Sequence, residues 1–575
     1  MRARRRQMRT AHSRVRSVVL LLALGGAALA LEGRMLYLQL VDHDFLAAQG
    51  DDRHIRTVQM AAHRGPIVDR NGELLAVSTP VDSIWANPGE LRPALDRVDE
   101  LAAALRLDAA ALARRITSSM NREFVYLARH LSPAAAANVL SLNLPGVYTQ
   151  REYRRYYPAG EVTGHVLGFT DIDDVGQEGL ELAFDYWLTG ENGAKRVVRD
   201  RFGRIVEDVD LIRAPRDGGE LRSSLDLRLQ YLAYRELKRA VTENGARSGA
   251  VVILEPRSGE VLAMVNQPTF NPNDRAQRVA AEIYRNRAVT DIFEPGSAFK
   301  PFVIAAALES GEFRADSVVD TTPGYVQVGA ERFEDPRNLG PITLTTLLAR
   351  SSNVGAVKLA LELKPEDMWA ALSRFGIGQL TGSSFPGESA GVLHDAEHWR
   401  PVGQATQAFG YGLSVTTLQL ARAYAAIAND GMLPGVTLLA DAAQPPPQRV
   451  ISRSTAADLL AMLEVVVSPE GSGFRAAVAN YRIAGKTGTA RKAGVGGYSD
   501  ARHTSVFAGL APASDPGIVV VVVIDEPGGE AYYGGDVAAP VFANIAAGAL
   551  RALAVSPDAL DADAPTVLAH ARVAP

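Results

Sequence analysis

Lysine is rare in this chain, and two of its lysines stand in settings that could support acyl-transfer chemistry. Only seven of the 60 basic residues are Lys. A buried Lys can lose its proton and act as a base, whereas Arg keeps its charge. Lys300 follows Ser297 by three residues, and if Pro295-Gly296 leads into a helix, both side chains lie on one face. A hydroxyl beside a neutral amine predicts a serine nucleophile with a lysine base.

Two further short motifs follow along the chain. Ser351-Ser352-Asn353 comes after Thr346–Arg350, which reads as a helix, and could supply a hydroxyl for proton relay and an amide for the substrate. Lys486-Thr487-Gly488-Thr489 follows Arg482–Gly485, which we expect to be a strand. An extended peptide can pair with the edge of such a strand, because Gly488 has no side chain to keep it away. The Lys and Thr side chains could then hold the peptide carboxylate.

Each motif alone is common, and Ser-x-x-Lys also fits a helix cap followed by a surface Lys. The ordered triple is far more specific, and it resembles the signature of penicillin-recognising acyl-serine enzymes. A wider set of segments resembles the septal class B penicillin-binding proteins, the FtsI type: Glu294 to Pro301, Arg350 to Gly355, Phe409 to Gly412, Leu418 to Gly431, Gly485 to Ala490 and Tyr532 to Phe542.

Two segments nearer the N-terminus extend this resemblance. Arg64 to Gly72 is similar to the membrane-proximal motif of the class. Asp200 to Arg204 favours the division branch of the class over the elongation branch. The resemblance covers about residues 18 to 552 and departs from the family at none of the three catalytic motifs.

The resemblance implies roles for the first two motifs. Ser297 would be the acylated nucleophile, attacking the D-Ala-D-Ala carbonyl of a peptidoglycan stem peptide, and Lys300 would be its base. Ser351 would relay the proton, and Asn353 would position the substrate amide.

The third motif would hold the substrate. Lys486, Thr487 and Thr489 would bind the terminal carboxylate, with Gly488 in the same substrate-binding strand. Backbone N–H groups of Ser297 and Thr489 would form the oxyanion hole. A positive charge on Lys486 is also expected to lower the pKa of the Lys300 amine, because like charges disfavour each other.

The family therefore implies a septal peptidoglycan D,D-transpeptidase that crosslinks stem peptides through an acyl-serine intermediate during cell division. An amine from a neighbouring strand would resolve the intermediate, and a β-lactam would stall that step. No cofactor and no metal are implied. The expected partners are stem peptides, β-lactams, a SEDS-type glycosyltransferase and other septal proteins.

Three other functions compete with this interpretation. A non-turnover penicillin sensor or scaffold would keep the fold but would be free to lose Lys300 or Asn353, and a β-lactamase would need a residue that holds a hydrolytic water. A zinc peptidase is suggested by His394, Glu397 and His398, which have inverted zinc-motif spacing, but the flanking Gly391 and Pro401 make a long helix unfavourable there. Asp171 to Asp174 lacks the later ligands of a calcium loop.

Composition excludes several broad classes. The 575 residues carry a net charge of −5 and are 47% apolar and 22% charged, which is ordinary for folded domains and argues against disorder or several membrane spans. A nucleic-acid binder would need a basic face, which this balance does not favour. With no Cys, disulfides, thiolate metal sites and Cys nucleophiles are impossible.

The N-terminus predicts a membrane anchor. Residues 1–17 form an Arg-rich tail, which we expect to be cytoplasmic, and residues 18–41 form an apolar span long enough for a bilayer. This topology would place the rest of the chain in the periplasm, on the inner membrane at the division septum. A cleaved signal peptide is the alternative, because Ala28-Leu29-Ala30 resembles a cleavage site.

Beyond the anchor, the pattern predicts an α+β protein. We expect an elongated membrane-proximal pedestal domain at residues 42–221, a transpeptidase domain at 222–553 and a disordered tail at 554–575. A helix from Asp226 to Asn244, a hairpin of Ala250–Leu254 with Val261–Val265, and late strands at His503–Leu510 and Ile518–Ile524 predict a central antiparallel sheet flanked by helices. The helices of the transpeptidase domain would include Leu344–Arg350, Pro365–Phe375 and Val415–Asn429. In the pedestal we expect helices at Leu101–Ser118 and Pro133–Leu142. We also expect extended chain over Arg196–Val209, with a turn at Phe202–Arg204.

Overall fold

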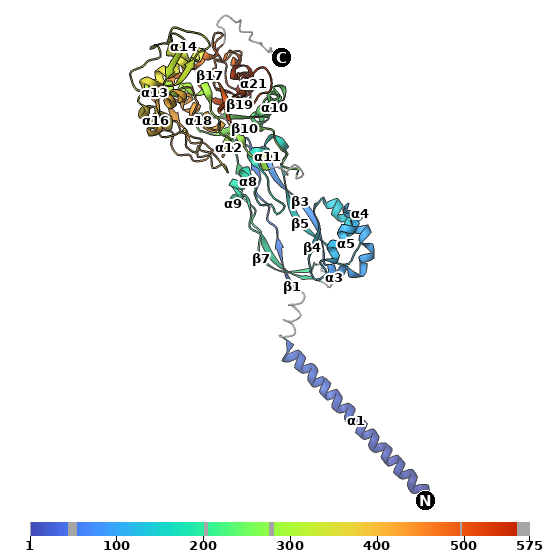
Figure 1. Cartoon of the computed structure of the whole chain (residues 1–575). Helices are drawn as coiled ribbons and strands as arrows, with labels where there is room; N and C mark the ends of the chain where they lie inside the picture. Colours follow the sequence, from blue (N-terminus) through green and yellow to red (C-terminus); the bar gives the residue numbers. More distant parts are fainter. Residues whose placement is uncertain (1, 44–54, 200–204, 275–280, 495–496, 560–575) are drawn as a thin grey trace, which may run out of the picture. The chain divides into compact units, whose positions relative to one another are not determined.

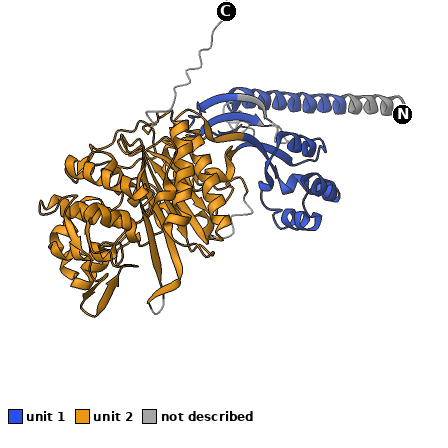
Figure 2. Cartoon of the chain, turned by 90° about the horizontal axis from the view of Figure 1, so that it is seen from above, with its two compact units in different colours: residues 1–62, 80–153, 191–217 blue, residues 63–79, 154–190, 218–575 orange. Residues whose placement is uncertain are grey.

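The computed structural model describes residues 2–43, 55–199, 205–274, 281–494 and 497–559 and divides into two compact units (Figure 2). Unit 1 consists of residues 1–62, 80–153 and 191–217, and unit 2 consists of residues 63–79, 154–190 and 218–575. The chain therefore passes between the units several times. Residues 200–204 and 560–575, which include the expected turn and most of the expected disordered tail, lie outside the described residues.

The predicted apolar span lies in a single long helix, α1 (Arg2–Leu40), at the N-terminal end of the chain (Figure 1). Its segment Val15–Leu40 has a mean hydropathy of 1.8 and buries none of its surface against the rest of the protein. At 1.5 Å per residue these 26 residues span about 39 Å, more than the ~30 Å of a bilayer core. It is the one helix in the described part of the chain that is long and apolar enough to cross a membrane.

Unit 1 contains a three-stranded antiparallel sheet and a small helical cluster. The sheet has the order β1 (Ile55–Met60), β6 (Gly193–Arg199), β7 (Ile205–Arg213), which confirms the extended chain expected around residue 196. Helices α4 (Val98–Leu105), α5 (Ala109–Thr117) and α6 (Pro133–Leu140) enclose a separate apolar core with strand β4 (Val125–Leu131).

The prediction of one continuous helix over Leu101–Ser118 is wrong. Arg106 ends α4 in the left-handed conformation, with φ of 56°, and Asp108 then caps α5 by accepting a hydrogen bond from the Ala111 N–H. The Ala and Leu content of the segment concealed this break, because a left-handed residue other than Gly leaves little signal in composition.

The core of unit 2 is a five-stranded antiparallel sheet that helices cover on both faces (Figure 1). The strand order is β10 (Val261–Gln267), β9 (Ser248–Leu254), β19 (Ile518–Asp525), β18 (Gly497–Ala511), β17 (Ala484–Gly494). The predicted hairpin and both late strands are confirmed. Along β9, Ala250 and Val252 enter one apolar core while Val251 and Ile253 enter the other, as the two-residue period of a strand requires.

Two helices cover one face of this sheet, α10 (Leu227–Glu243) and α21 (Ala539–Ala552). The predicted start of α10 is confirmed, because the Asp226 side chain accepts a hydrogen bond from the Arg228 N–H as an N-cap. The other face packs against the helices inserted between β10 and β17. These include α13 (Lys300–Glu309), α14 (Leu344–Arg350), α15 (Asn353–Glu362), α16 (Pro365–Arg374), α18 (Thr417–Ala428) and α19 (Arg453–Val467).

The Arg64–Gly72 motif contributes to the same unit through buried polar contacts. Arg64 is buried and forms ion pairs with Glu181 and Asp185, both at 2.7 Å. Asp69 accepts hydrogen bonds from the backbone of Glu73 and from the Leu227 N–H at the start of α10. The motif therefore joins three separate chain segments of unit 2.

Candidate active site

Ser297 and Lys300 lie on consecutive turns, as their spacing predicts. Ser297 is half-buried in a 3₁₀ turn, η4 (Gly296–Phe299), and Lys300 is the fully buried first residue of α13. Gly296 precedes them with φ of 56°, and a Cβ atom there would lie 2.8 Å from the Thr489 carbonyl oxygen. Only glycine fits this position, and the close approach sets the Ser297 backbone beside strand β17.

The Lys300 ammonium is held by the second motif. Its Nζ donates to the Asn353 Oδ1 at 2.8 Å, to the Ser351 carbonyl oxygen at 2.6 Å and to the Ser351 Oγ at 3.3 Å. Ser351 ends α14 in the left-handed conformation, with φ of 59°. A strained backbone of this kind is costly for a residue with a side chain, and such strain gathers at functional sites.

Lys486 also donates to the Ser351 hydroxyl. It lies on β17, and its Nζ donates to the Ser351 Oγ at 3.0 Å and to the Thr487 carbonyl oxygen at 3.0 Å. The structure therefore brings Lys300, Ser351, Asn353 and Lys486 into one hydrogen-bonded cluster, with the Ser351 hydroxyl shared between two amines.

Burial controls the protonation of both lysines. Burial lowers the pKa of Lys300 to about 7, against a smaller opposing effect of the Asp335 carboxylate. Burial also lowers the pKa of Lys486 well below its usual value, and the Lys300 charge lowers it further. The sequence predicted a like-charge effect of Lys486 on Lys300. The structure shows desolvation as the cause of the Lys300 shift and the like-charge effect on Lys486.

Asp335 is a site residue that the sequence did not reveal. Its buried carboxylate accepts hydrogen bonds from the Asn353 N–H at 2.6 Å, the Val354 N–H at 3.2 Å and the Ser352 hydroxyl at 2.5 Å. It therefore fixes the N-terminus of α15, on which Asn353 stands. No motif marks an Asp eighteen positions before Asn353, so only the folded chain identifies it.

The Lys-Thr-Gly strand β17 is an edge strand, since β18 is its one neighbour among the strands that the structure describes. The physical role of Gly488 differs from the predicted one. A Cβ atom at Gly488 would lie 2.4 Å from the Pro295 carbonyl oxygen and 3.0 Å from the Ala298 Cβ. The missing side chain thus lets η4 pack on the strand, which brings the Ser297 turn against β17.

The two Thr hydroxyls of this strand each have a protein partner. The Thr487 Oγ1 lies 3.0 Å from the Ser472 Oγ, and the Thr489 Oγ1 accepts a hydrogen bond from the Gly534 N–H at 2.9 Å. Both partners come from segments outside the three motifs. Gly534 belongs to Tyr532–Phe542, which the sequence resemblance includes, whereas Ser472 was missed by sequence reasoning. The Thr489 hydroxyl keeps its own proton to donate to a ligand.

The residues considered for metal binding lie elsewhere. Glu397 and His398 occupy a short 3₁₀ turn, η5 (Ala396–His398), and His394 precedes it. Asp171 accepts hydrogen bonds from the N–H groups of Asp173 and Val175, so its carboxylate stabilises a tight turn. In the part of the chain that the structure describes, no three His, Cys, Asp or Glu side chains gather closely enough to hold a metal ion.

Fold and site together define a penicillin-binding acyl-serine protein, and comparison with known families agrees. The profile of the penicillin binding protein transpeptidase domain matches residues 249–547. The profile of the penicillin-binding protein dimerisation domain matches residues 59–223. The chain belongs to the penicillin-binding protein transpeptidase family.

Full-length relatives are similar along almost the whole chain. A probable peptidoglycan D,D-transpeptidase PbpC of Pseudomonas aeruginosa is 45% identical over 94% of this chain and 95% of its own length. The peptidoglycan D,D-transpeptidase FtsI of Escherichia coli is 43% identical over 92% of this chain and 90% of its own length. These relatives and helix α1 indicate a membrane-anchored protein.

Solved structures share the fold. A peptidoglycan synthetase from Bifidobacterium adolescentis superposes with a TM-score of 0.70 at 28% identity, over 89% of this chain and 99% of that one. The transpeptidase domain of penicillin-binding protein 3 from Burkholderia pseudomallei gives a TM-score of 0.54 at 41% identity, over 58% of this chain and 97% of that one.

Proposed function

We propose that this chain is a septal peptidoglycan D,D-transpeptidase that crosslinks stem peptides through an acyl-Ser297 intermediate. The observation that carries the proposal is the hydrogen-bonded cluster of two buried lysines, Lys300 and Lys486, with the partly buried Ser351 and Asn353. The cluster lies near the Ser297 turn and at the edge of the sheet that the described strands form. The family match and the names of the relatives support it.

In the acylation step, the Ser297 hydroxyl attacks the carbonyl carbon of the penultimate D-Ala, and Lys300 takes the hydroxyl proton. With a pKa near 7, the Lys300 amine is largely neutral above neutral pH and can act as a base. The new bond joins the Ser297 Oγ to the carbonyl carbon. The bond to the terminal D-Ala breaks, and its nitrogen receives a proton through the Ser351 hydroxyl, which lies between both amines.

The oxyanion and the carboxylate are bound by the strand and the turn that meet it. The N–H groups of Ser297 and Thr489 would stabilise the negative charge that develops on the carbonyl oxygen. Thr487 and Thr489 would donate to the terminal carboxylate. A bound carboxylate favours a protonated Lys486, because it supplies the opposite charge that this buried amine lacks.

In the second step, an amine from a neighbouring strand attacks the acyl carbon, gives its proton to the same lysine base and releases Ser297. The product is a peptide crosslink. A β-lactam enters as a donor and leaves an acyl group that this step does not remove.

The proposal includes the setting of the reaction. We place the chain in the inner membrane as a single-pass protein, with its Arg-rich tail in the cytoplasm and both units in the periplasm at the septum. The Arg tail before an apolar helix supports this topology. A SEDS-type glycosyltransferase and other septal proteins are the proposed partners, as the sequence resemblance to the septal class implies.

Covalent labelling with a fluorescent penicillin tests the nucleophile. We expect the wild-type protein to carry the label through denaturing electrophoresis and Ser297→Ala to carry none. Covalent label on Ser297→Ala would show that another residue is acylated.

Full activity in EDTA is expected, whereas inhibition by EDTA would favour the zinc hypothesis of His394 and His398.

A turnover assay separates the enzyme from a penicillin sensor. A peptide that ends in D-Ala-D-Ala is incubated with the full chain and a D-amino acid as the amine acceptor. An enzyme releases D-Ala and forms the exchanged peptide, whereas a sensor is labelled by penicillin but forms no product.

A further inference from the structure

The direction of the donor peptide along β17 follows from the proposed function, on which this inference rests. In the proposed reaction, Thr487 and Thr489 would bind the terminal carboxylate, and the carbonyl that is attacked would lie at the N–H groups of Ser297 and Thr489. An extended chain advances about 3.3 Å per residue. The residues that precede the acylated D-Ala therefore continue along the strand, past Thr489 to Ala490 and Arg491.

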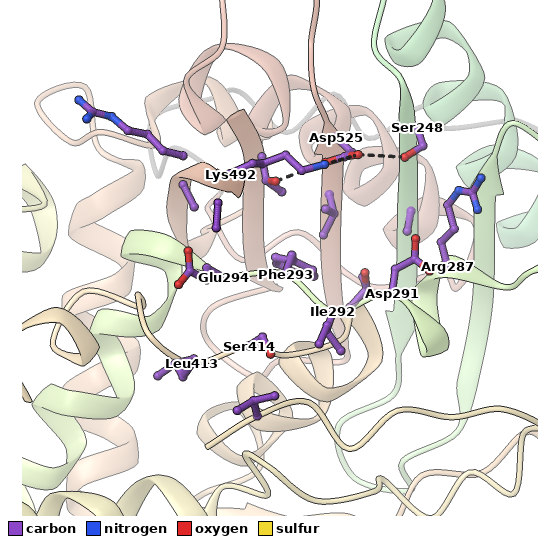
Figure 3. Close-up of a pocket in the computed structure, with 18 of the residues that line it drawn as sticks. Ser248, Arg287, Asp291, Ile292, Phe293, Glu294, Leu413, Ser414, Lys492 and Asp525 are labelled. Atoms are coloured by element: carbon purple, nitrogen blue, oxygen red, sulfur yellow. Dashed lines mark hydrogen bonds and ion pairs between the residues drawn. The ribbon is translucent and has the colours of Figure 1, made fainter. Parts of the chain in front are cut away.

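A cavity of about 500 Å³ meets this part of β17 and extends across the sheet to Asp525 of β19 and Ser248 of β9. Its wall includes Ala490–Ala493 of β17, the Gly412–Ser414 loop and Glu294, which stands three residues before the nucleophile (Figure 3). Tyr411 and Tyr498 stand beside Glu294, with their rings edge to face at 5.2 Å. The Tyr411 hydroxyl accepts a hydrogen bond from the Arg491 N–H, which fixes this ring against the strand.

Most charged groups of the cavity already have a partner of opposite charge. Lys492 extends across to Asp525 at 2.7 Å, as Figure 3 shows. Asp291 pairs with Arg285 at 2.9 Å, and Arg491 pairs with Asp500 at 3.0 Å. The carboxylates of Asp525 and Asp291 are therefore neutralised within the protein.

Glu294 differs from these carboxylates. It accepts hydrogen bonds from the Gly412 N–H and the Tyr498 hydroxyl, both at 2.8 Å, but it forms no ion pair with any residue that the structure describes. Its half-buried position raises the pKa of the carboxyl group. The Gly412 N–H and the Tyr498 hydroxyl orient the Glu294 carboxylate but carry no charge. A cation bound here would therefore be attracted by the full negative charge of this carboxylate.

We propose that Glu294 binds the side-chain ammonium of the donor residue that precedes the D-Ala pair. Crosslinking requires a stem-peptide amine as its nucleophile, and donor and acceptor stems are copies of one polymer, so the donor carries the same amine. The alkyl part of that side chain would pack on the Tyr411 and Tyr498 rings. Glu294 thus selects donor stems with a free, cationic side chain at this position.

Two matched peptides test the proposal with the full-length protein. Both end in D-Ala-D-Ala and carry Lys before this pair, with a free ε-amine in one and an acetylated ε-amine in the other. The measured quantity is the ratio of their kcat/KM values for D-Ala release. For the wild type we expect a ratio of about 10 in favour of the free amine, and for Glu294→Gln a ratio below about 2. The control is Asp291→Asn, which removes a cavity carboxylate that Arg285 already neutralises and is expected to keep the ratio.

The ratio distinguishes recognition from a structural role, since a misfolded fraction lowers both rates equally. The same ratio in the wild type and Glu294→Gln would overturn the assignment, and so would loss of the preference in Asp291→Asn alone. If the wild type releases D-Ala from neither peptide, the proposed transpeptidase function itself fails. Turnover of both peptides without selection by Glu294 overturns this inference alone.

Discussion

At the scale of single residues, the proposed chemistry depends on the Lys300 amine, whose pKa burial lowers to about 7. Replacing Lys300 by Arg keeps the positive charge but removes a proton that can be lost. We expect Lys300→Arg to lower the second-order rate constant for acylation by a fluorescent penicillin by at least 100-fold. Labelling of this variant at the wild-type rate would contradict the base assignment.

The pH dependence of acylation follows from the same residue. The folded-state pKa of Lys300 is lowered to about 7, so the amine is protonated and inactive below this pH and neutral and active above it. We expect the acylation rate of the wild type to rise as the pH increases through about 7 and then to level off. A rate that falls over this range would contradict the assignment.

Asp335 acts on this titration from outside the three motifs. Its negative charge raises the pKa of Lys300 against the effect of burial. We therefore expect Asp335→Asn to move the midpoint of the acylation profile to lower pH, and to lower the plateau rate because the N-terminus of α15 is less firmly held. An unchanged midpoint with a lower plateau would leave Asp335 a purely structural role.

These residues also mark what sequence can and cannot reveal about the site. The types and order of the motifs predicted that Lys300, Ser351 and Lys486 meet, and the hydrogen bonds of both amines to the Ser351 hydroxyl confirm this. Asp335 and Ser472 contact the motifs through tertiary packing. A contact of this kind has no fixed spacing along the chain and leaves no pattern to find.

At the scale of elements, the site depends on how closely turn η4 approaches strand β17. A Cβ atom at Gly488 would lie 2.4 Å from the Pro295 carbonyl oxygen, so Gly488→Ala must push the Ser297 turn away from the strand. We expect acylation to fall by at least 10-fold and the free energy of unfolding to fall by about 1–3 kcal/mol. The control is Gly517→Ala, which has open space around its Cβ position and should retain both. Normal acylation in Gly488→Ala would contradict the role of this contact.

Elements with local signals were predictable, and those without them were not. The cap at Asp226 and the turn between β9 and β10 are local, and both predictions are confirmed. The break at Arg106 divides a segment of strong helix formers, and its cause is a single left-handed backbone position. Helix propensity averaged over a window of residues conceals such a position.

At the scale of the whole molecule, unit 2 is assembled from three chain segments that a sequence cannot assign to one another. Hydropathy predicted a sheet covered by helices, but composition does not show that residues 63–79 and 154–190 pack with the segment that begins at residue 218. Buried charges join the first two of these segments, because Arg64 pairs with Glu181 and Asp185, and Arg155 also pairs with Glu181, at 2.6 Å.

This charge cluster gives the last prediction. Arg64→Ala leaves the buried Glu181 with Arg155 as its remaining ion-pair partner. Breaking a buried ion pair costs about 3–5 kcal/mol of stability. We expect urea unfolding of unit 2 to shift to lower concentration by that free energy, measured by tryptophan fluorescence in a Trp85→Phe background, which leaves Trp187, Trp369 and Trp399 of unit 2. Arg97→Ala removes an exposed pair in unit 1 and should leave the transition unchanged. Equal stability of Arg64→Ala and the wild type would mean that the buried pairs do not hold the segments together. If Arg64→Ala lowers the stability as expected, any loss of penicillin labelling in this variant should disappear at lower temperature. The reason is that Arg64 acts on the stability of the unit that carries the site and not on the reaction.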